Sequence, residues 1–258
     1  MMLPIQYAEH PPPDVLAETV RDLWSFTASD AVKPGTFTLP PDPCTSLAVV
    51  QMGPRVGLRI VGPHLEPLNV PVGPGSRVRG VRFLPDAAGR VLGIDPSAWP
   101  DRNEAAETVV PELAERVCAS STVDAGREAL LDALAERVRY APPPDALVRA
   151  SLETIEALRG ELRVSELATD LAVSPRTLQR RFRAATGLSP KRYARVRRFL
   201  MAVSNVIRDD PDPWGRVAAE FGYADQAHFV RECVALTGMP PTGFADRMAP
   251  IQHIDVRP

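Results

Sequence analysis

The stretch SPRTLQRRFRAATGLSPKRY, residues 174–193, predicts a short helix with one cationic side. Ser174 and the proline after it are typical of a helix start, because the serine oxygen caps free N–H groups and proline has no N–H to leave unpaired. Leu178 and Phe182 lie four residues apart and predict a narrow buried stripe. Gly187 predicts the end of the helix in a left-handed conformation. A helix of this kind suits insertion into a DNA groove.

Charge is distributed unevenly along the chain. Its 258 residues allow two domains, each with its own core, and their net charge is only -2. Residues 1–148 hold 13 basic and 19 acidic side chains, a net of -6, whereas residues 149–248 hold 16 and 12, a net of +4. Residues 171–208 contain ten basic side chains and no acidic one. This block favours a nucleic-acid partner, although a solvated basic face would give the same count.

Cysteine usage and the N-terminus bear on the compartment. The three cysteines are widely spaced and form no CxxC pair, which indicates reduced thiols in a reducing compartment. The first residues have neither a basic region nor an apolar core of the signal-peptide type. No apolar run approaches the roughly 18–20 residues that span a bilayer. We therefore expect a cytoplasmic protein without a membrane partner.

Residues 1–100 are predicted to form a small β-rich domain, a sandwich or a barrel. Apolar residues alternate with polar ones, glycine or proline in residues 46–52, 56–60, 68–72 and 81–83, which is the period of strands. Residues 14–27 fit a short helix or an edge strand. His10 and His64 are far apart, and no nucleophile elbow, phosphate loop or dinucleotide motif is present. We expect no catalytic residue, metal or cofactor. The sequence neither identifies nor excludes a cavity for a small molecule.

Residues 101–145 are predicted to form a helical linker. The clearest helix spans about residues 124–139, and its apolar stripe either packs on the β domain or contacts a second copy of the chain. The stripe consists of Leu130, Leu131, Leu134 and Val138. Three prolines at 142–144 then separate this region from residues 146–248. The whole chain is thus predicted to be α+β, with an all-α C-terminal domain and a tail at 249–258.

The C-terminal domain contains a repeat. A shift of 51 residues pairs identical residues at six positions. They are Arg180/Arg231, Ala184/Ala235, Thr186/Thr237, Gly187/Gly238, Pro190/Pro241 and Ala194/Ala245. Upstream the offset is 50, so the second unit has a turn that is one residue longer and contains Gly222. Each copy has the spacing of a helix-turn-helix unit, and residues 190–208 between them predict a helix roughly 28 Å long.

Four segments carry a resemblance to a known family: S-P-R-T-L-Q-R-R-F, G-L-S-P-K, G-Y-A-D-Q-A-H-F-V-R-E and T-G-M-P-P-T-G-F. Over about residues 150–248 the chain resembles the DNA-binding domain of the AraC/XylS family of bacterial transcription regulators. Its D-Q-A-H-F variant and short first half are similar to a subgroup whose N-terminal domain is poorly understood. Cys233 stands where the family usually has Phe, which we expect to loosen the second core. The family's sugar-binding first domain has no matching motif here.

The resemblance implies a transcription regulator that is not an enzyme and that binds double-stranded DNA. A small-molecule effector, a second copy of the chain and RNA polymerase are the further partners it suggests. We expect sequence-specific reading of two successive major-groove half-sites, with the first recognition helix as the stronger anchor. The alternatives are a sensor or enzyme whose N-terminal domain carries the primary activity, and an architectural DNA binder with little sequence preference.

Candidate DNA-contacting residues lie on the two recognition helices and the connector. Arginine can pair with guanine and glutamine with adenine, but phosphate contacts are equally open for each arginine. His228 has no partner at metal-ligand spacing, so we expect a DNA contact or a helix-surface role for it. On the connector we expect some arginines to bind phosphate and some to pair with Asp209, Asp210 or Asp212. The candidates are Arg176, Thr177, Gln179, Arg180, Arg183, Gln226, Ala227, His228, Arg231, Arg192 and Arg195.

Overall fold

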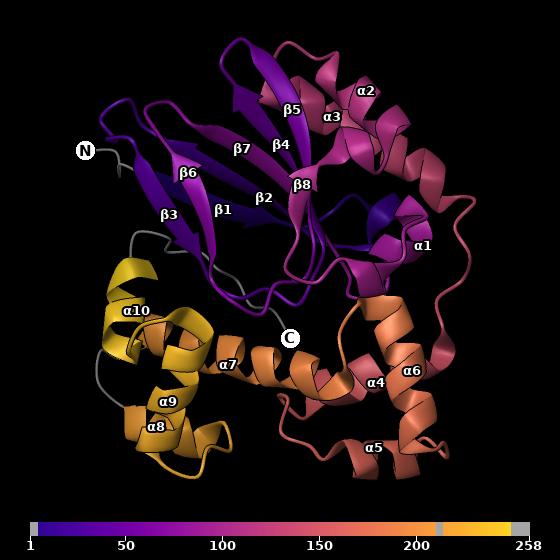
Figure 1. Ribbon diagram of the computed structural model, residues 1–258, viewed down its shortest axis with the longest axis vertical. Coiled ribbons are helices and arrows are strands. Elements are labelled where there is room, and N and C mark those ends of the chain that lie inside the picture. Colours follow the sequence, from indigo (N-terminus) through magenta and orange to yellow (C-terminus); the bar gives the residue numbers. More distant parts are fainter. Residues whose placement is uncertain (1–4, 210–213, 249–258) are drawn as a thin grey trace.

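A computed structural model describes residues 5–209 and 214–248 of the chain, and Figure 1 shows a β-rich half above a helical half. Six antiparallel strands form one sheet in the order β1-β2-β7-β4-β5-β8, and β3 pairs with β6 in a separate two-stranded sheet. The predicted α+β class is therefore confirmed. The strands are β1 (Ile5–His10), β2 (Val20–Ala28), β3 (Gly35–Leu39), β4 (Ser46–Met52), β5 (Arg55–Val61), β6 (Leu68–Val72), β7 (Arg77–Phe83) and β8 (Asn103–Ala105).

The four strand segments predicted from alternation are all present as β4, β5, β6 and β7. The prediction for residues 14–27 was wrong in its detail, because Asp14–Leu16 form a 3-10 helix and β2 is an interior strand. β2 lies between β1 and β7 and is covered on both faces, so its apolar residues do not alternate simply. Leu23 faces one buried cluster, and Trp24 and Phe26 face the other.

Helices cover one face of the large sheet. They are α1 (Ala88–Leu92), α2 (Pro111–Cys118) and α3 (Val123–Val138), with short 3-10 turns η2 (Pro96–Ala98) and η3 (Ala106–Thr108) between them. Leu130 and Leu134 of the predicted α3 stripe are fully buried against strand residues such as Leu47 and Val49. The stripe is thus used in packing on the β domain. The domain boundaries after residues 100 and 145 stay predictions.

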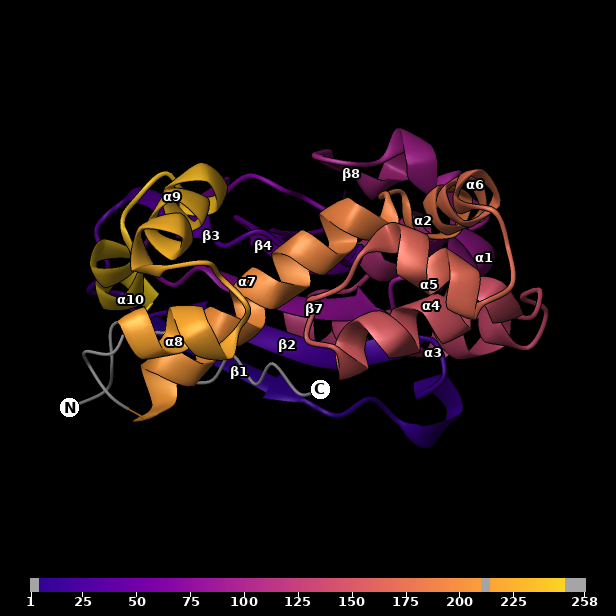
Figure 2. The same ribbon diagram turned by 90° about the horizontal axis from the view of Figure 1, so that it is seen from below.

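Seven helices form the C-terminal half of the described chain: α4 (Ala146–Ala157), α5 (Val164–Asp170), α6 (Pro175–Thr186), α7 (Pro190–Asp209), α8 (Trp214–Glu220), α9 (Gln226–Thr237) and α10 (Pro241–Met248). α5 and α6 make the first helix-turn-helix unit, and α8 and α9 make the second. The 20 residues of α7 give it a length of about 30 Å. Figures 1 and 2 show the two units at opposite ends of α7.

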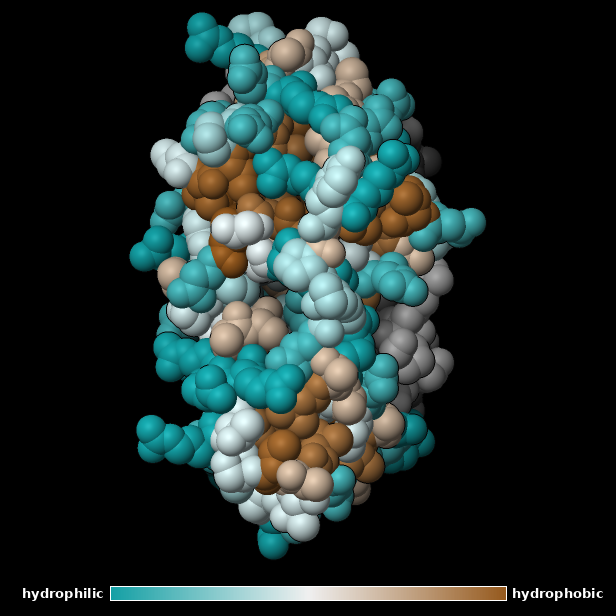
Figure 3. Space-filling view, turned by 90° about the vertical axis from the view of Figure 1, so that its right-hand side faces the viewer, coloured by the Kyte–Doolittle hydropathy of each residue, from teal (hydrophilic) through white to brown (hydrophobic). Residues whose placement is uncertain are grey.

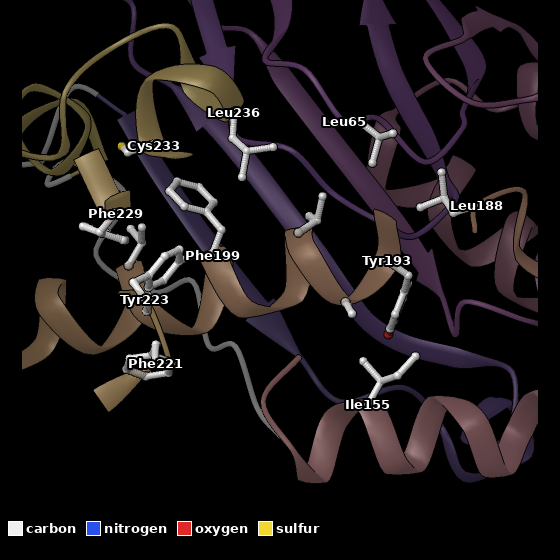
Figure 4. Packing of buried hydrophobic residues seen from close by; sticks show 14 of the residues in the cluster. Leu65, Ile155, Leu188, Tyr193, Phe199, Phe221, Tyr223, Phe229, Cys233 and Leu236 are labelled. Carbon is white, nitrogen blue, oxygen red and sulfur yellow. The ribbon is translucent and has the colours of Figure 1, made fainter. Parts of the chain in front are cut away.

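The second face of the sheet packs on the helical half. Phe26 of β2 contacts Phe37 of β3, with ring centroids 5.6 Å apart. Both belong to a buried cluster that continues through Leu65 and Leu188 into the core around α7, as Figure 4 shows. The ion pair between Arg149 of α4 and Asp86, at 3.0 Å, joins the halves a second time. The helical half is therefore held against the β domain by both apolar and charged contacts.

On the face shown in Figure 3, apolar patches are interrupted by hydrophilic side chains. In the part of the chain that the structure describes, every helix is too short or too polar to cross a lipid bilayer.

Candidate nucleic-acid interface

The two recognition helices begin and end in the same way. Ser174 Oγ accepts a hydrogen bond from the Thr177 amide at 3.1 Å at the start of α6, and Asp225 accepts one from the His228 amide at 2.6 Å at the start of α9. Gly187 and Gly238 end the helices at φ values of 80° and 75°, where a side chain would be strained. The caps predicted from the sequence repeat are confirmed in both copies.

Apolar stripes fix which side of each helix faces outward. Leu178 and Phe182 of α6 are fully buried, and Phe182 packs edge-on against Tyr193 with ring centroids 5.7 Å apart. Phe229 takes the same place in α9, stacked on Trp214 at 5.7 Å. Because these residues point into the core, the polar sides of both helices lie on the surface.

Cys233 of α9 is fully buried at the position where we expected a loosened core. Its Sγ lies 3.4 Å from the Met239 carbonyl oxygen and 3.6 Å from Thr237 Oγ1. Burial raises the pKa of this thiol to about 11, although the hydrogen bond to Thr237 opposes the shift. The thiol is therefore a packed, neutral part of the second core.

The polar side of α6 carries free cations. Arg176, Arg180 and Arg183 are exposed, and none of them makes an ion pair with any described residue. Gln179 is also exposed, while Thr177 is half-buried with its hydroxyl 2.9 Å from Ser174 Oγ. All five predicted residues of this helix thus lie around its exposed side and N-terminus.

Arg181, which is not among the residues predicted to contact DNA, differs from the other arginines of α6. Its Nε donates to Asp145 at 2.8 Å, and its Nη2 donates to the second oxygen of the same carboxylate. Asp145 in turn caps α4 by accepting from the amides of Leu147 and Val148. Arg181 therefore ties α6 to α4, whereas its three neighbours are available to a partner.

α9 presents fewer groups than α6. Gln226, Ala227 and Arg231 are exposed, and Arg231 makes no ion pair within the described part of the chain. His228 is half-buried: its Nδ1 accepts from the Ala224 amide at 3.3 Å, and its ring meets Tyr223 edge-on. Because Nδ1 accepts this bond, Nε2 is the ring nitrogen left for an outside contact.

The arginines of the connector α7 divide into two classes. Arg192 is exposed and makes no ion pair with a described residue, as expected for a phosphate contact. Arg195 instead donates to both oxygens of Glu232 of α9, at 2.7 and 3.0 Å. Arg197 is 2% exposed and pairs with Glu156 of α4. The pairing expected with Asp209, Asp210 and Asp212 lies outside the described side chains.

Burial and hydrogen bonding act against each other at the Glu156 carboxylate. Burial alone would raise the pKa of Glu156, but the hydrogen bonds from Arg197 and Tyr193 outweigh it, so the pKa is lowered. The Arg197–Glu156 contact spans 41 positions of sequence, and the Arg195–Glu232 contact spans 37. No local pattern could have predicted these partners.

Among the described residues, no three His, Cys, Asp or Glu side chains are grouped so that they could hold a metal ion. His64 is buried, and its Nε2 lies 2.9 Å from the Pro40 carbonyl oxygen, a contact between segments 24 residues apart in the β domain. The cysteines Cys44, Cys118 and Cys233 are all free thiols.

Two family models match the chain. One, described as a helix-turn-helix domain, matches residues 167–247, and the other, a domain of unknown function named DUF6597, matches residues 8–105. Solved structures with a similar fold include ToxT from Vibrio cholerae, with 10% identity, a TM-score of 0.49, and coverage of 87% of this chain and 97% of that one. Unsaturated fatty acid bound ToxT from Vibrio cholerae has 7% identity, a TM-score of 0.44 and coverage of 93% and 94%. Likenesses at these TM-scores do not extend to function. A comparison with curated proteins found no match.

Proposed function

We propose that this chain, a DNA-binding transcription regulator whose residues 167–247 belong to the AraC-type helix-turn-helix domains, reads two adjacent half-sites on one face of a DNA duplex. α6 would enter the major groove at one half-site and α9 at the next. The regulator class follows from the domain match, and the two-site reading is the part that we propose.

The observation that carries the proposal is the division of the arginines near α6. Arg181, Arg195 and Arg197 are neutralised by carboxylates of the same chain. Arg176, Arg180 and Arg183 share one exposed side and make no ion pair with any described residue. Unpaired guanidinium groups on a capped, rigid helix are suited to phosphates and to the acceptor edge of guanine.

The length of the connector supports the use of both units at once. α7 spans about 30 Å, and one turn of B-DNA rises roughly 34 Å. Recognition helices held at the two ends of such a rod can reach successive major-groove segments on the same side of a duplex. Among the described residues, α9 offers Gln226, the Nε2 of His228 and Arg231 as polar readers, fewer than α6, so we expect the first unit to supply most of the affinity.

The β-rich domain is proposed to regulate DNA binding through its contact with α6. A Cβ at Gly187 would lie 2.5 Å from the Pro96 carbonyl oxygen, so the end of the recognition helix touches the N-terminal domain directly. A small-molecule effector acting through this contact, a second copy of the chain and RNA polymerase remain proposed partners from the family resemblance. No observation in the described structure favours an enzymatic activity.

Selection of bound duplexes from a random pool tests the proposal. The expected product is a site with two conserved half-sites at one fixed spacing. Arg180→Ala should relax the preference at one base pair by about 5- to 150-fold, which corresponds to about 1–3 kcal/mol. Arg192→Ala, the matched control, should weaken binding to all sequences alike and lower the salt slope by about one.

Two results would contradict this function. A selected site with a single half-site would remove the role of α9. Unchanged affinity and preference in Arg180→Ala would show that the exposed side of α6 is not the recognition surface.

A further inference from the structure

We propose that the loop between α4 and α5, residues 158–163, clasps the second helix-turn-helix unit and thereby sets the spacing of half-sites that the chain accepts. We call the contacts of this loop with α7 and with the α8–α9 turn the clasp; they are made by Arg159, Gly160, Glu161, Arg198, Glu220, Phe221, Gly222 and Tyr223. The inference rests on the proposed reading of two half-sites. It adds the residues that fix the two readers relative to each other.

The loop first closes on the connector. Arg159 and Gly160 have φ values of 52° and 75°, which turn the chain sharply after α4. A Cβ at Gly160 would lie 2.3 Å from the Ala194 carbonyl oxygen and 3.0 Å from the Arg198 amide nitrogen. The loop backbone therefore rests directly on the α7 backbone, and at this point only glycine fits.

The same loop then reaches the second unit. Arg159 Nη1 lies 3.3 Å from Glu220 Oε1, and its guanidinium lies 5.6 Å from the centroid of the Phe221 ring. A Cβ at Gly222 would lie 2.2 Å from the Glu161 carboxyl carbon. Residues 61 positions apart in sequence are thus in contact, so the α4–α5 loop touches both α7 and the second unit.

Arg198 of α7 completes the contact from the connector side. Its guanidinium lies 4.4 Å from the centroid of the Tyr223 ring, and Nη1 lies 3.5 Å from the Gly222 carbonyl oxygen. Tyr223 packs edge-on against Phe229 of α9, with ring centroids 5.1 Å apart. Figure 4 shows Tyr223 and Phe229 beside Phe199, which lies at the middle of α7. The clasp therefore extends to the recognition helix itself.

The sequence repeat marks the same place. The second turn is one residue longer than the first, and it contains Gly222 at a φ of 67°. The extra residue thus lies in the segment that meets the α4–α5 loop. α7 already holds the second unit through the Arg195–Glu232 ion pair and the stacking of Phe199 on Phe229. The clasp adds a contact from the α4–α5 loop, so three segments restrict the orientation of the second unit relative to the first.

The first test compares DNA spacings. Binding of the full chain is measured on the selected duplex and on duplexes with one base pair added or removed between half-sites. In the wild type we expect the altered spacings to bind at least tenfold more weakly. The double variant Arg159→Ala/Arg198→Ala loses two cation–aromatic contacts and one ion pair. In this variant the ratio of the affinity at the selected spacing to the affinity at an altered spacing should fall by about three- to tenfold. Arg159→Ala alone, at an exposed side chain, should move the ratio in the same direction.

Arg163→Ala is the matched control. Arg163 lies in the same loop and is 82% exposed at its side chain, but its ion-pair partner is Glu166 within α5. The Arg163→Ala substitution removes one positive charge, as Arg159→Ala does. The affinity of this variant for DNA should change equally at every spacing, so that its ratio of affinities between spacings stays that of the wild type.

The second test needs no DNA. Spin labels are attached at cysteines that replace Ala184 of α6 and Ala235 of α9, both exposed, in a chain whose half-buried Cys118 is replaced by serine. The wild type should give one narrow distance distribution, and Arg159→Ala/Arg198→Ala a broader one. If no paired half-sites are selected, the proposed function fails while this measurement still tests the clasp. If the variants keep both the spacing ratio and the narrow distribution, the clasp is overturned.

Discussion

Asp22 of β2 is a buried carboxyl whose replacement should stabilise the protein in a pH-dependent way. Arg82 Nη1 donates to both of its oxygens, at 2.9 and 3.0 Å, and the same guanidinium also faces Glu9 and Asp42. Burial is the main cause that raises the pKa of Asp22 from 3.8 to about 6. The neighbouring carboxylates Glu9 and Asp42 raise it further, and Arg82 opposes the shift.

The direction in which stability changes with pH follows from proton binding to Asp22. A carboxyl with a raised pKa holds its proton more tightly when folded, so stability is lost as the pH rises from 3.8 through 6. The shift of roughly two pH units corresponds to about 3 kcal/mol at pH 8, of which about 1.5 kcal/mol develops between pH 5 and pH 8. Asp22→Asn keeps an acceptor for Arg82 but removes this cost.

Urea unfolding at pH 5 and pH 8 measures the effect. The difference in free energy of unfolding between Asp22→Asn and the wild type should grow by about 1.5 kcal/mol in favour of the variant at the higher pH. Asp170→Asn, at an exposed carboxyl of α5, removes the same charge away from the Arg82 network and is the control. An equal difference at both pH values would refute the raised pKa of Asp22.

Two further substitutions test the helix cap and the domain contact. Ser174→Ala should lower the free energy of unfolding by about 1 kcal/mol, because the Thr177 amide loses its acceptor. Ser174→Asp, which supplies another acceptor, should keep the free energy of unfolding near that of the wild type in the same assay. Asp86→Asn should leave Arg149 without its charged partner at the domain contact, costing up to about 3 kcal/mol, and should change DNA affinity without changing the selected sequence. Urea unfolding and repeated duplex selection measure the two effects, and a changed sequence preference in Asp86→Asn would contradict the assignment of Asp86 to the domain contact.

The parts of the fold that follow local rules could be predicted from the sequence. Ser174 and Gly187 cap α6 by contacts within four residues, and Leu178 with Phe182 forms a stripe of helical period. The repeat then extended these predictions to α9. Strands β4 to β7 also follow a local rule, since alternation with turn residues between segments needs no knowledge of the rest of the chain.

The other parts depend on contacts between distant segments. β2 was ambiguous because its two faces join different clusters, which only the assembled sheet determines. β1 and β3 were not predicted at all. The partners of Arg181 and Arg195 lie 36 and 37 residues away, so the sequence could not divide paired from free arginines. That division, and not the number of basic residues, is what identifies the arginines of α6 that are available to a partner.

The two helix-turn-helix units differ in the number of cations available to DNA, and the β-rich domain contacts the unit that has more of them. α6 holds three arginines without a described ion-pair partner, whereas α9 holds one, and His228 is engaged with the turn before it. It is also α6 whose final glycine meets the Pro96 carbonyl oxygen of the β-rich domain. On the proposed function, the β-rich domain therefore touches the unit that supplies most of the affinity. A change of the N-terminal domain near Pro96 would act first on the stronger half-site, and the clasp would carry it to the second.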